Sequence, residues 1–282
     1  MSTRFIPIIA SQAGGNGSFS VRALESHLLG KWASPVLLLD EFRVTGRPFP
    51  PHPHAGFSAV TYVLEDSNGN LRSRDSLGND LVTGPGGVVW TQAASGLLHE
   101  ELPSDPHREL HAVQVFVNLS SRNKFVAPKT LRLQAKEVPE WRSESGDRVR
   151  AVVGTFRTTQ SPLSPAEPFT LLDVQLRSHL AVDLPDGHNS VVYVLSGSVR
   201  LDNGVQASEV VGGGALVAHG GGGSLSVKAN LNSKLLFLSG ADLHEPVVAR
   251  GPFVMNDDSQ IADSVARYEG GAMGHLGALA AR

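Results

Sequence analysis

Short apolar runs recur along the whole chain, and clusters of glycine, proline and other turn-forming residues separate them. The runs that we interpret as strands lie at residues 36–39, 57–64, 86–91, 111–119, 169–176, 190–195, 215–217 and 235–238. Several are rich in β-branched and aromatic residues, and alternation within 57–64 places Thr61 and Tyr62 on opposite faces. Short strands separated by turn signals in this way predict an all-β protein.

The two halves of the chain resemble each other faintly. The run VTYVL at 60–64 is echoed by VVYVL at 191–195, and glycine-rich turns precede the apolar runs that follow each of them. This echo predicts two copies of one β-barrel module, although two strands can also share such a run by chance. A charged, proline-containing segment between residues 127 and 147 reads as the linker, so we predict domains at 1–135 and 136–282.

One helix is expected near the end of the chain. Asn256 is a suitable N-cap, and Ile261, Val265 and Tyr268 follow at helical spacing. Gly270 and Gly271 would end the helix.

Composition narrows the classes of function. The chain has 282 residues, a formal charge of −3, 6% aromatic residues and no cysteine. Disulfides, thiolate metal sites and a cysteine nucleophile are thereby excluded, and neither direct nucleic-acid binding nor a membrane association is indicated. Without a run of about 18 apolar residues or an apolar leader, we expect a cytoplasmic protein.

Two short runs carry the candidate chemistry. His52 and His54 are two residues apart, and Pro51 and Pro53 restrain the backbone around them to extended conformations. Residues two apart in an extended strand share one face, so both imidazoles should point the same way. The alternative is a proline-rich loop with solvated histidines.

The second run is His99-Glu100-Glu101. His99 and Glu101 should share a face, and Glu100 should then point to solvent. An inward carboxylate is costly unless it meets a cation or another partner, although an exposed pair is the alternative. The spacing therefore predicts one metal site built from four side chains, namely His52, His54, His99 and Glu101.

The donor set constrains the metal. Three imidazoles and one carboxylate differ from the cysteine-rich, closed sets of structural zinc. On an octahedral ion they leave two adjacent positions open, as non-haem Fe(II) chemistry requires. Mn, Ni, Co and Cu would accept the same donors, and the sequence does not choose between them and Fe(II).

Several motifs together resemble the pirin family. They are PPHPHAGF at 50–57, VTYVLE at 60–65, RDSLGN at 74–79, GPG at 84–86, GLLHEELP at 96–103, EPVV at 245–248 and GPFVMN at 251–256. The resemblance implies two tandem cupin (jelly-roll-like) β-barrels, a bicupin, with iron held in the first barrel by His52, His54, His99 and Glu101, and a second barrel without metal ligands. At the expected pocket mouth, Ala55 and Ser95 stand where arginines are common in the family.

Two functions follow from the resemblance and stay open at this point. The first is a quercetin 2,3-dioxygenase-like oxidoreductase, in which a flavonol or related enol and O2 meet at the metal and Glu101 acts as general base. Phe57, Val63, Trp90 and Leu98 are candidates for lining its cavity, although core packing would explain them equally well. The second is a non-enzymatic, metal- or redox-sensing regulator that binds a protein partner.

Overall fold

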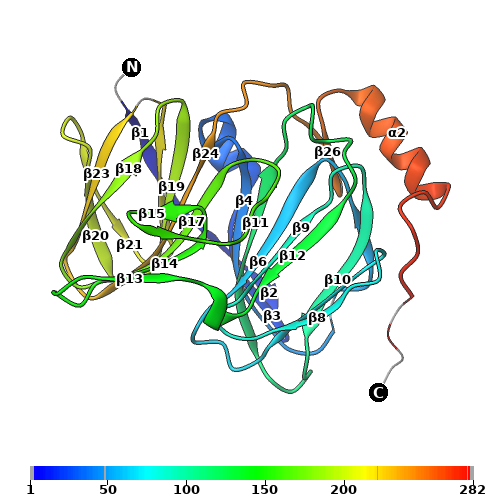
Figure 1. Ribbon diagram of the computed structural model, residues 1–282, viewed down its shortest axis with the longest axis horizontal. Helices are drawn as coiled ribbons and strands as arrows, with labels where there is room; N and C mark the ends of the chain where they lie inside the picture. Colours follow the sequence, from blue (N-terminus) through cyan, green and yellow to red (C-terminus); the bar gives the residue numbers. More distant parts are fainter. Residues whose placement is uncertain (1–2, 48, 221, 278, 280–282) are drawn as a thin grey trace.

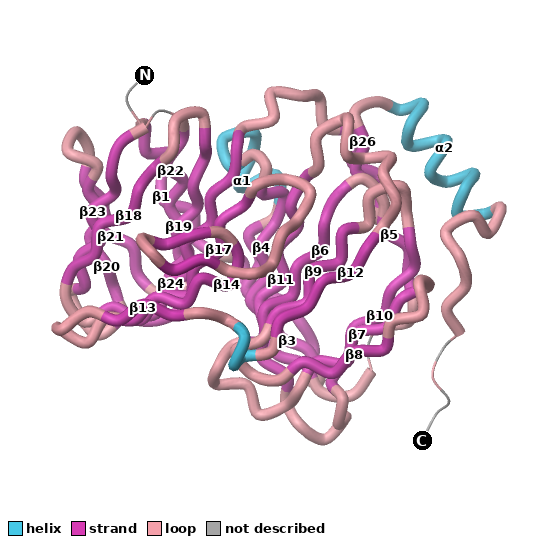
Figure 2. The backbone as a smooth tube through the Cα atoms, viewed as in Figure 1, coloured by secondary structure: helices cyan, strands magenta, loops and turns pink. Residues whose placement is uncertain are grey.

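The computed structural model describes residues 3–47, 49–220, 222–277 and 279. Within them, β-strands form two barrels that lie side by side (Figures 1 and 2). The alternation of buried and exposed side chains is clearest in strands with one face in a barrel, such as β18 (His179–Leu184). The all-β prediction is confirmed.

The first barrel is built from a seven-stranded and a four-stranded sheet. The larger sheet has the order β12 (Lys129–Leu133), β9 (Val88–Gln92), β6 (Phe57–Val63), β11 (Leu110–Asn118), β4 (Val36–Val44), β3 (Phe19–Leu24) and β2 (Gln12–Asn16). The smaller sheet has the order β5 (His52–His54), β10 (Leu97–Pro103), β7 (Leu71–Asp75) and β8 (Asp80–Thr83).

The second barrel repeats this plan strand for strand. Its larger sheet has the order β1 (Arg4–Ala10), β22 (Gly214–His219), β19 (His188–Ser196), β24 (Ser233–Ala241), β17 (Phe169–Leu176), β14 (Arg148–Val153) and β13 (Glu140–Arg142). Its smaller sheet has the order β18, β23 (Gly223–Ala229), β20 (Ser198–Asp202) and β21 (Ala207–Val211). The echo between residues 60–64 and 191–195 therefore reflects equivalent strands, β6 and β19.

Short elements complete the chain. They are α1 (Ser26–Leu29), the 3₁₀ helices η1 (Gly30–Ala33) and η2 (Ala135–Glu137), the hairpin β15 (Thr155–Phe156) and β16 (Thr159–Gln160), the hairpin β25 (Val248–Arg250) and β26 (Phe253–Met255), and α2 (Asp258–Glu269). Among the described residues, no helix is long and apolar enough to cross a membrane.

Both ends of the chain cross to the opposite barrel. The N-terminal strand β1 pairs with β22 of the second barrel, with Arg4 opposite His219. At the other end, Val254 donates its backbone N–H to Ala55 of the first barrel at 3.0 Å, and α2 lies on the outside of that barrel (Figure 1). The predicted boundary at residue 135 falls in η2, while β1 and the C-terminal segment pair with the barrel that the other half of the chain forms.

The C-terminal helix forms where the sequence predicts it, with one correction. The N-cap is Asp257, whose carboxylate accepts a hydrogen bond from the Gln260 N–H at 2.9 Å, rather than Asn256. Ile261 is buried, whereas Tyr268 is exposed. The helix ends at Gly270, as predicted.

The two larger sheets pack face to face through one continuous apolar core. Two tyrosines cross this interface in opposite directions. The Tyr62 hydroxyl donates to Asp173 at 2.6 Å, and the Tyr193 hydroxyl donates to Glu41 at 2.7 Å. Tyr62 and Tyr193 are the same position of the repeated VTYVL and VVYVL runs, so each barrel gives its partner a hydroxyl and receives one in return.

Candidate metal centre

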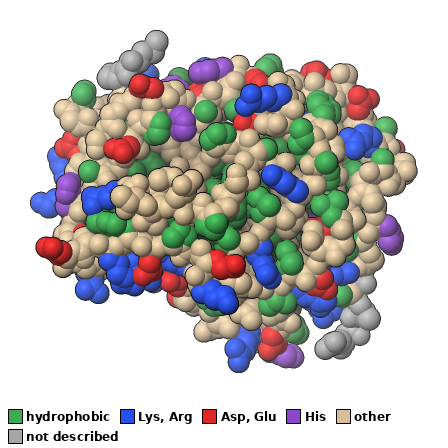
Figure 3. Space-filling view, viewed as in Figure 1, with side chains coloured by type: hydrophobic (Ala, Val, Ile, Leu, Met, Phe, Trp, Pro, Cys, Tyr) green, Lys and Arg blue, Asp and Glu red, His purple; other side chains and the backbone are tan. Residues whose placement is uncertain are grey.

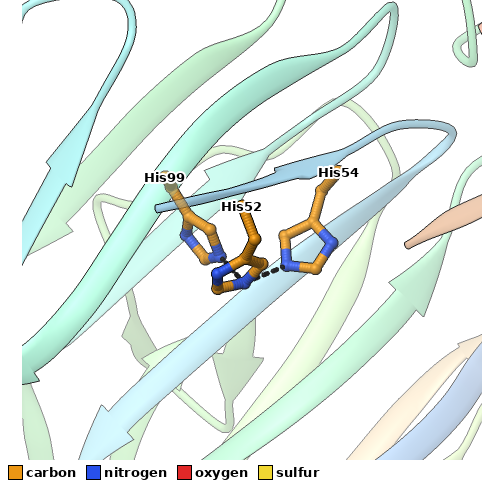
Figure 4. A group of neighbouring side chains, drawn as sticks. All are labelled: His52, His54 and His99. Carbon is orange, nitrogen blue, oxygen red and sulfur yellow. Dashed lines mark hydrogen bonds between the residues drawn. The ribbon is translucent and has the colours of Figure 1, made fainter. Parts of the chain in front are cut away.

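Three histidines converge at the edge of the smaller sheet of the first barrel (Figure 4). Antiparallel pairing of β5 with β10 places His52 directly opposite His99, and His54 follows on the same face as His52. The Nε2 atom of His52 lies 3.1 Å from that of His54 and 3.1 Å from that of His99. The proline-flanked strand predicted from the sequence therefore places its two imidazoles beside that of His99, which lies 45 residues after His54.

These imidazoles suit a cation. His99 and His54 are only 1% and 5% exposed. Burial, followed by the neighbouring histidines, lowers the pKa of His54 to about 3 and that of His99 well below its usual range. Both rings are therefore neutral near pH 7, and each neutral ring has one nitrogen lone pair to offer to an ion.

The tautomer of His52 also suits metal binding. Its Nδ1 lies 3.0 Å from the carbonyl oxygen of Pro50, which can only accept, so Nδ1 carries the proton and Nε2 presents a lone pair to the cluster. Donors at adjacent positions of an octahedral ion, each about 2.1 Å from it, are separated by about 3.0 Å. Both separations from His52 match that spacing, and all three donor atoms lie within 4.8 Å of one another, so the three histidines could hold a metal ion.

Glu101 lies in the same cavity but outside the group of three converging nitrogens. Its Oε2 accepts hydrogen bonds from the Thr61 hydroxyl at 2.5 Å and from Gln114 Nε2 at 3.4 Å. Burial raises the pKa of Glu101 to about 7, although hydrogen bonds from Thr61, Ser73 and Gln114 act in the opposite direction. Its roles as fourth ligand and as general base stay predictions.

Glu100 does not point to solvent, contrary to the alternation argument. It is 5% exposed, and its carboxylate accepts a hydrogen bond from Arg74 Nη1 at 2.7 Å. The prediction was wrong because the outer face of this sheet is covered. The C-terminal segment passes over it, with the backbone oxygen of Gly277 accepting a hydrogen bond from Arg74 at 3.2 Å.

A cavity of about 250 Å³ adjoins the histidines. Its lining combines apolar and aromatic side chains with a few polar ones: Phe19, Asp40, Phe42, Val44, Phe49, His52, Leu71, His99, Glu101, Leu110 and Gln114. The four predicted lining residues are absent from this set. Phe57, Val63, Trp90 and Leu98 belong instead to apolar clusters around the cavity or between the barrels.

Ala55 does not line the cavity either. It is fully buried and packs against Phe253 and Met255 of the C-terminal segment. A long charged side chain would not fit there without displacing that segment.

Sequence reasoning missed Asp40. The predicted strand at 36–39 continues as β4 to Val44, and Asp40 follows its apolar run directly. One carboxylate oxygen, Oδ1, is buried and has no hydrogen-bond partner among the described residues. Burial, with a smaller contribution from Glu25, raises the pKa of Asp40 to about 6. A carboxylate at the end of an apolar strand was the available signal.

A buried lysine holds the strand that carries His52 and His54. Lys124 is fully buried, and its Nζ donates to the Gly56 carbonyl at 2.8 Å, the Asn118 side-chain oxygen at 2.6 Å and the Val254 carbonyl at 3.0 Å. Gly56 has a φ of 86°, and a Cβ there would meet the Val254 carbonyl at 1.8 Å. The C-terminal segment thus docks tightly beside the end of β5.

With this geometry in hand, comparisons with known proteins identify the family. Residues 15–117 match the family model described as Pirin, and residues 171–274 match the model described as Pirin C-terminal cupin domain. The chain belongs to the pirin family. The two tandem cupin barrels with a C-terminal helix, expected from the resemblance, are thereby confirmed.

Individual pirin relatives cover most of the chain. A Pseudomonas aeruginosa protein, provisionally named a quercetin 2,3-dioxygenase, is 37% identical over 275 residues, which are 91% of this chain and 92% of the relative. Pirin of Rattus norvegicus is 33% identical over 88% of this chain and 85% of its own. The crystal structure of quercetin 2,3-dioxygenase from Acinetobacter baumannii superposes with a TM-score of 0.85 at 28% identity, covering 98% of this chain and all of that one.

Proposed function

We propose that this pirin is a metal-dependent dioxygenase that acts on quercetin-like flavonols or a related enol. The observation that carries the proposal is the convergence of three imidazole Nε2 atoms beside a largely apolar cavity that is also lined by the carboxylates of Asp40 and Glu101. The names of relatives that cover most of the chain point to the same chemistry.

We assign His52, His54, His99 and Glu101 as the ligands of one divalent ion, with Fe(II) as first choice. Such an ion supplies Lewis-acid and redox chemistry for the reaction of the substrate with O2. The protein contributes a cavity whose apolar walls suit an aromatic ring. Glu101, held by Thr61 and Gln114, is positioned to accept the hydroxyl proton of the substrate.

The test is O2 uptake with quercetin after removal of metal by a chelator and reloading with Fe(II), Mn, Ni, Co or Cu. Ring-opening by at least one metal form is expected. The His99→Ala variant should lose both metal content and turnover, whereas His188→Ala, a histidine in the second barrel, should keep both. Absence of turnover with all five metals would overturn the proposal and favour a regulatory protein.

A further inference from the structure

Two polar residues that line the cavity, Asp40 and Gln114, lie with Thr61 on one row of paired residues across the large sheet. Asp40 of β4 is opposite Gln114 of β11, and Gln114 is opposite Thr61 of β6. Paired residues on neighbouring strands share a face, so all three side chains project into the barrel. Two of them, Thr61 and Gln114, hold Glu101.

Asp40 differs from Glu101 because one of its carboxylate oxygens has no hydrogen-bond donor among the described residues. Glu101 already accepts hydrogen bonds from Thr61 and Gln114, whereas Asp40 Oδ1 has no partner in the described part of the chain. A buried carboxylate oxygen without a donor costs about 1–3 kcal/mol, so this unpaired oxygen calls for a donor from outside the protein, such as a bound molecule or water.

The charge of the lining restricts what that molecule can be. Two carboxylates, Asp40 and Glu101, line the cavity, and no lysine or arginine is among its described lining residues. An anionic ligand such as a small carboxylate or a phosphate would meet repulsion there. A neutral molecule with a hydroxyl donor and an apolar ring fits both the carboxylates and the walls formed by residues such as Phe19 and Phe42.

We propose that Asp40 binds the substrate directly, by accepting a hydrogen bond from a hydroxyl group of a neutral phenol or enol that lies beside the three histidines. This inference rests on the proposed function, because it takes the cavity as the substrate site. It adds a residue outside the metal set, with a role distinct from that of Glu101.

The test measures binding without turnover. Quercetin is titrated anaerobically into the nickel-loaded protein, and flavone, which has the same ring system without hydroxyls, serves as the matched ligand. In Asp40→Asn, quercetin affinity should fall by about 10- to 100-fold, the range of a hydrogen bond to a charged group, while flavone affinity stays unchanged. Asp40→Leu should weaken quercetin at least as much.

Control measurements distinguish substrate binding by Asp40 from a role in metal binding or in folding. Nickel affinity should be unchanged in both Asp40 variants, and Asp80→Asn, the same change at a carboxylate on the outside of β8, should leave quercetin affinity unchanged. Asp40 has no substrate role if the variants bind quercetin like the parent, lose both ligands equally, or lose nickel. The same holds if the parent binds no quercetin. Quercetin binding that depends on Asp40, without O2 uptake in air, would instead count against the dioxygenase alone.

Discussion

The two barrels share one backbone plan but differ in what fills them. In the first barrel, the row across β4, β11 and β6 is Asp40, Gln114 and Thr61. In the second barrel, the equivalent row across β17, β24 and β19 is Leu172, Phe237 and Val192. Each polar position in the first barrel has an apolar counterpart in the second, so the same strand pairing forms around a polar or an apolar interior.

The smaller sheets show the same contrast. β5 and β10 present histidines to the interior, whereas the matching strands β18 and β23 present leucine and valine. The inward residues of these two strands are Leu180, Val182, Leu184, Leu225 and Val227. A closed apolar core suffices to hold such a barrel together, and the polar interior of the first barrel is the part that requires a functional explanation.

The largest expected effect comes from making the first barrel resemble the second at one ligand. In His54→Leu, nickel affinity should fall by at least about 100-fold, more than the loss of an outer-sphere contact usually costs. The metal-free variant should be no less stable than the parent, because His54 packs against the rings of Phe57 and Phe116 and leucine suits such surroundings. Calorimetric titration and thermal unfolding measure the two properties.

A stability loss in metal-free His54→Leu would mean that the imidazole has a structural role in its own right. His179→Leu is the control, since this histidine lies on the equivalent strand β18 and is exposed. Its nickel affinity should equal that of the parent.

The next effect concerns the lysine that joins the C-terminal segment to the first barrel. Lys124→Met leaves the Gly56 and Val254 carbonyls and the Asn118 side chain without their donor, which should lower the free energy of unfolding by about 3 kcal/mol. Nickel affinity should also weaken, because Gly56 lies two residues after His54. Denaturant unfolding measures the stability of Lys124→Met, with Lys136→Met, at an exposed lysine, as the control. Equal stability of the two variants would contradict the prediction.

One buried carboxylate of the second barrel, Asp147, contrasts with Asp40 and Glu101 of the first. Asp147 is fully buried, and it accepts hydrogen bonds from the backbone N–H groups of Arg177 and Ser178 at 2.7 and 2.9 Å and from three serine hydroxyls. Burial alone would raise the pKa of Asp147, but these hydrogen bonds, led by that of the Ser178 hydroxyl, lower it well below its usual range. Asp40 and Glu101, in contrast, have raised pKa values.

Asp147→Asn should therefore destabilise the protein by about 2 kcal/mol at pH 7, because the amide cannot accept the three serine hydroxyls at its nitrogen. A carboxyl with a lowered folded-state pKa stabilises the fold when ionised, and this contribution starts to fall below about pH 4 and is fully lost only below the folded-state pKa. The difference in melting temperature between parent and variant should shrink between pH 5 and 3. A difference that stays constant would show that the charge contributes nothing, and Asp183→Asn on β18 is the exposed control.

The sequence predicted what depends on local spacing. The pairs His52–His54 and His99–Glu101 could be placed on common faces because strand geometry fixes alternate side chains, and eight strands could be located from their apolar runs. It did not predict Asp40 or Gln114, because their place in the cavity depends on the register between β4, β11 and β6. Nor did it predict the burial of Glu100, since its cover comes from residues more than 170 positions away along the chain.

The smallest effect tests the two tyrosines that cross between the barrels. Tyr62→Phe removes the hydroxyl that donates to Asp173 and accepts from Arg150 Nη1 at 2.6 Å. Burial raises the pKa of Asp173, and the charges of Arg150 and Arg148 act in the opposite direction. Tyr193→Phe removes one donor of Glu41, which keeps a contact with His111 Nε2 at 3.2 Å and an ion pair with Arg22. Tyr62→Phe should therefore cost about 1–2 kcal/mol in the free energy of unfolding, and Tyr193→Phe less. Equal losses in the two variants would contradict this difference between the barrels. Tyr268→Phe, on the exposed part of α2, is the matched control.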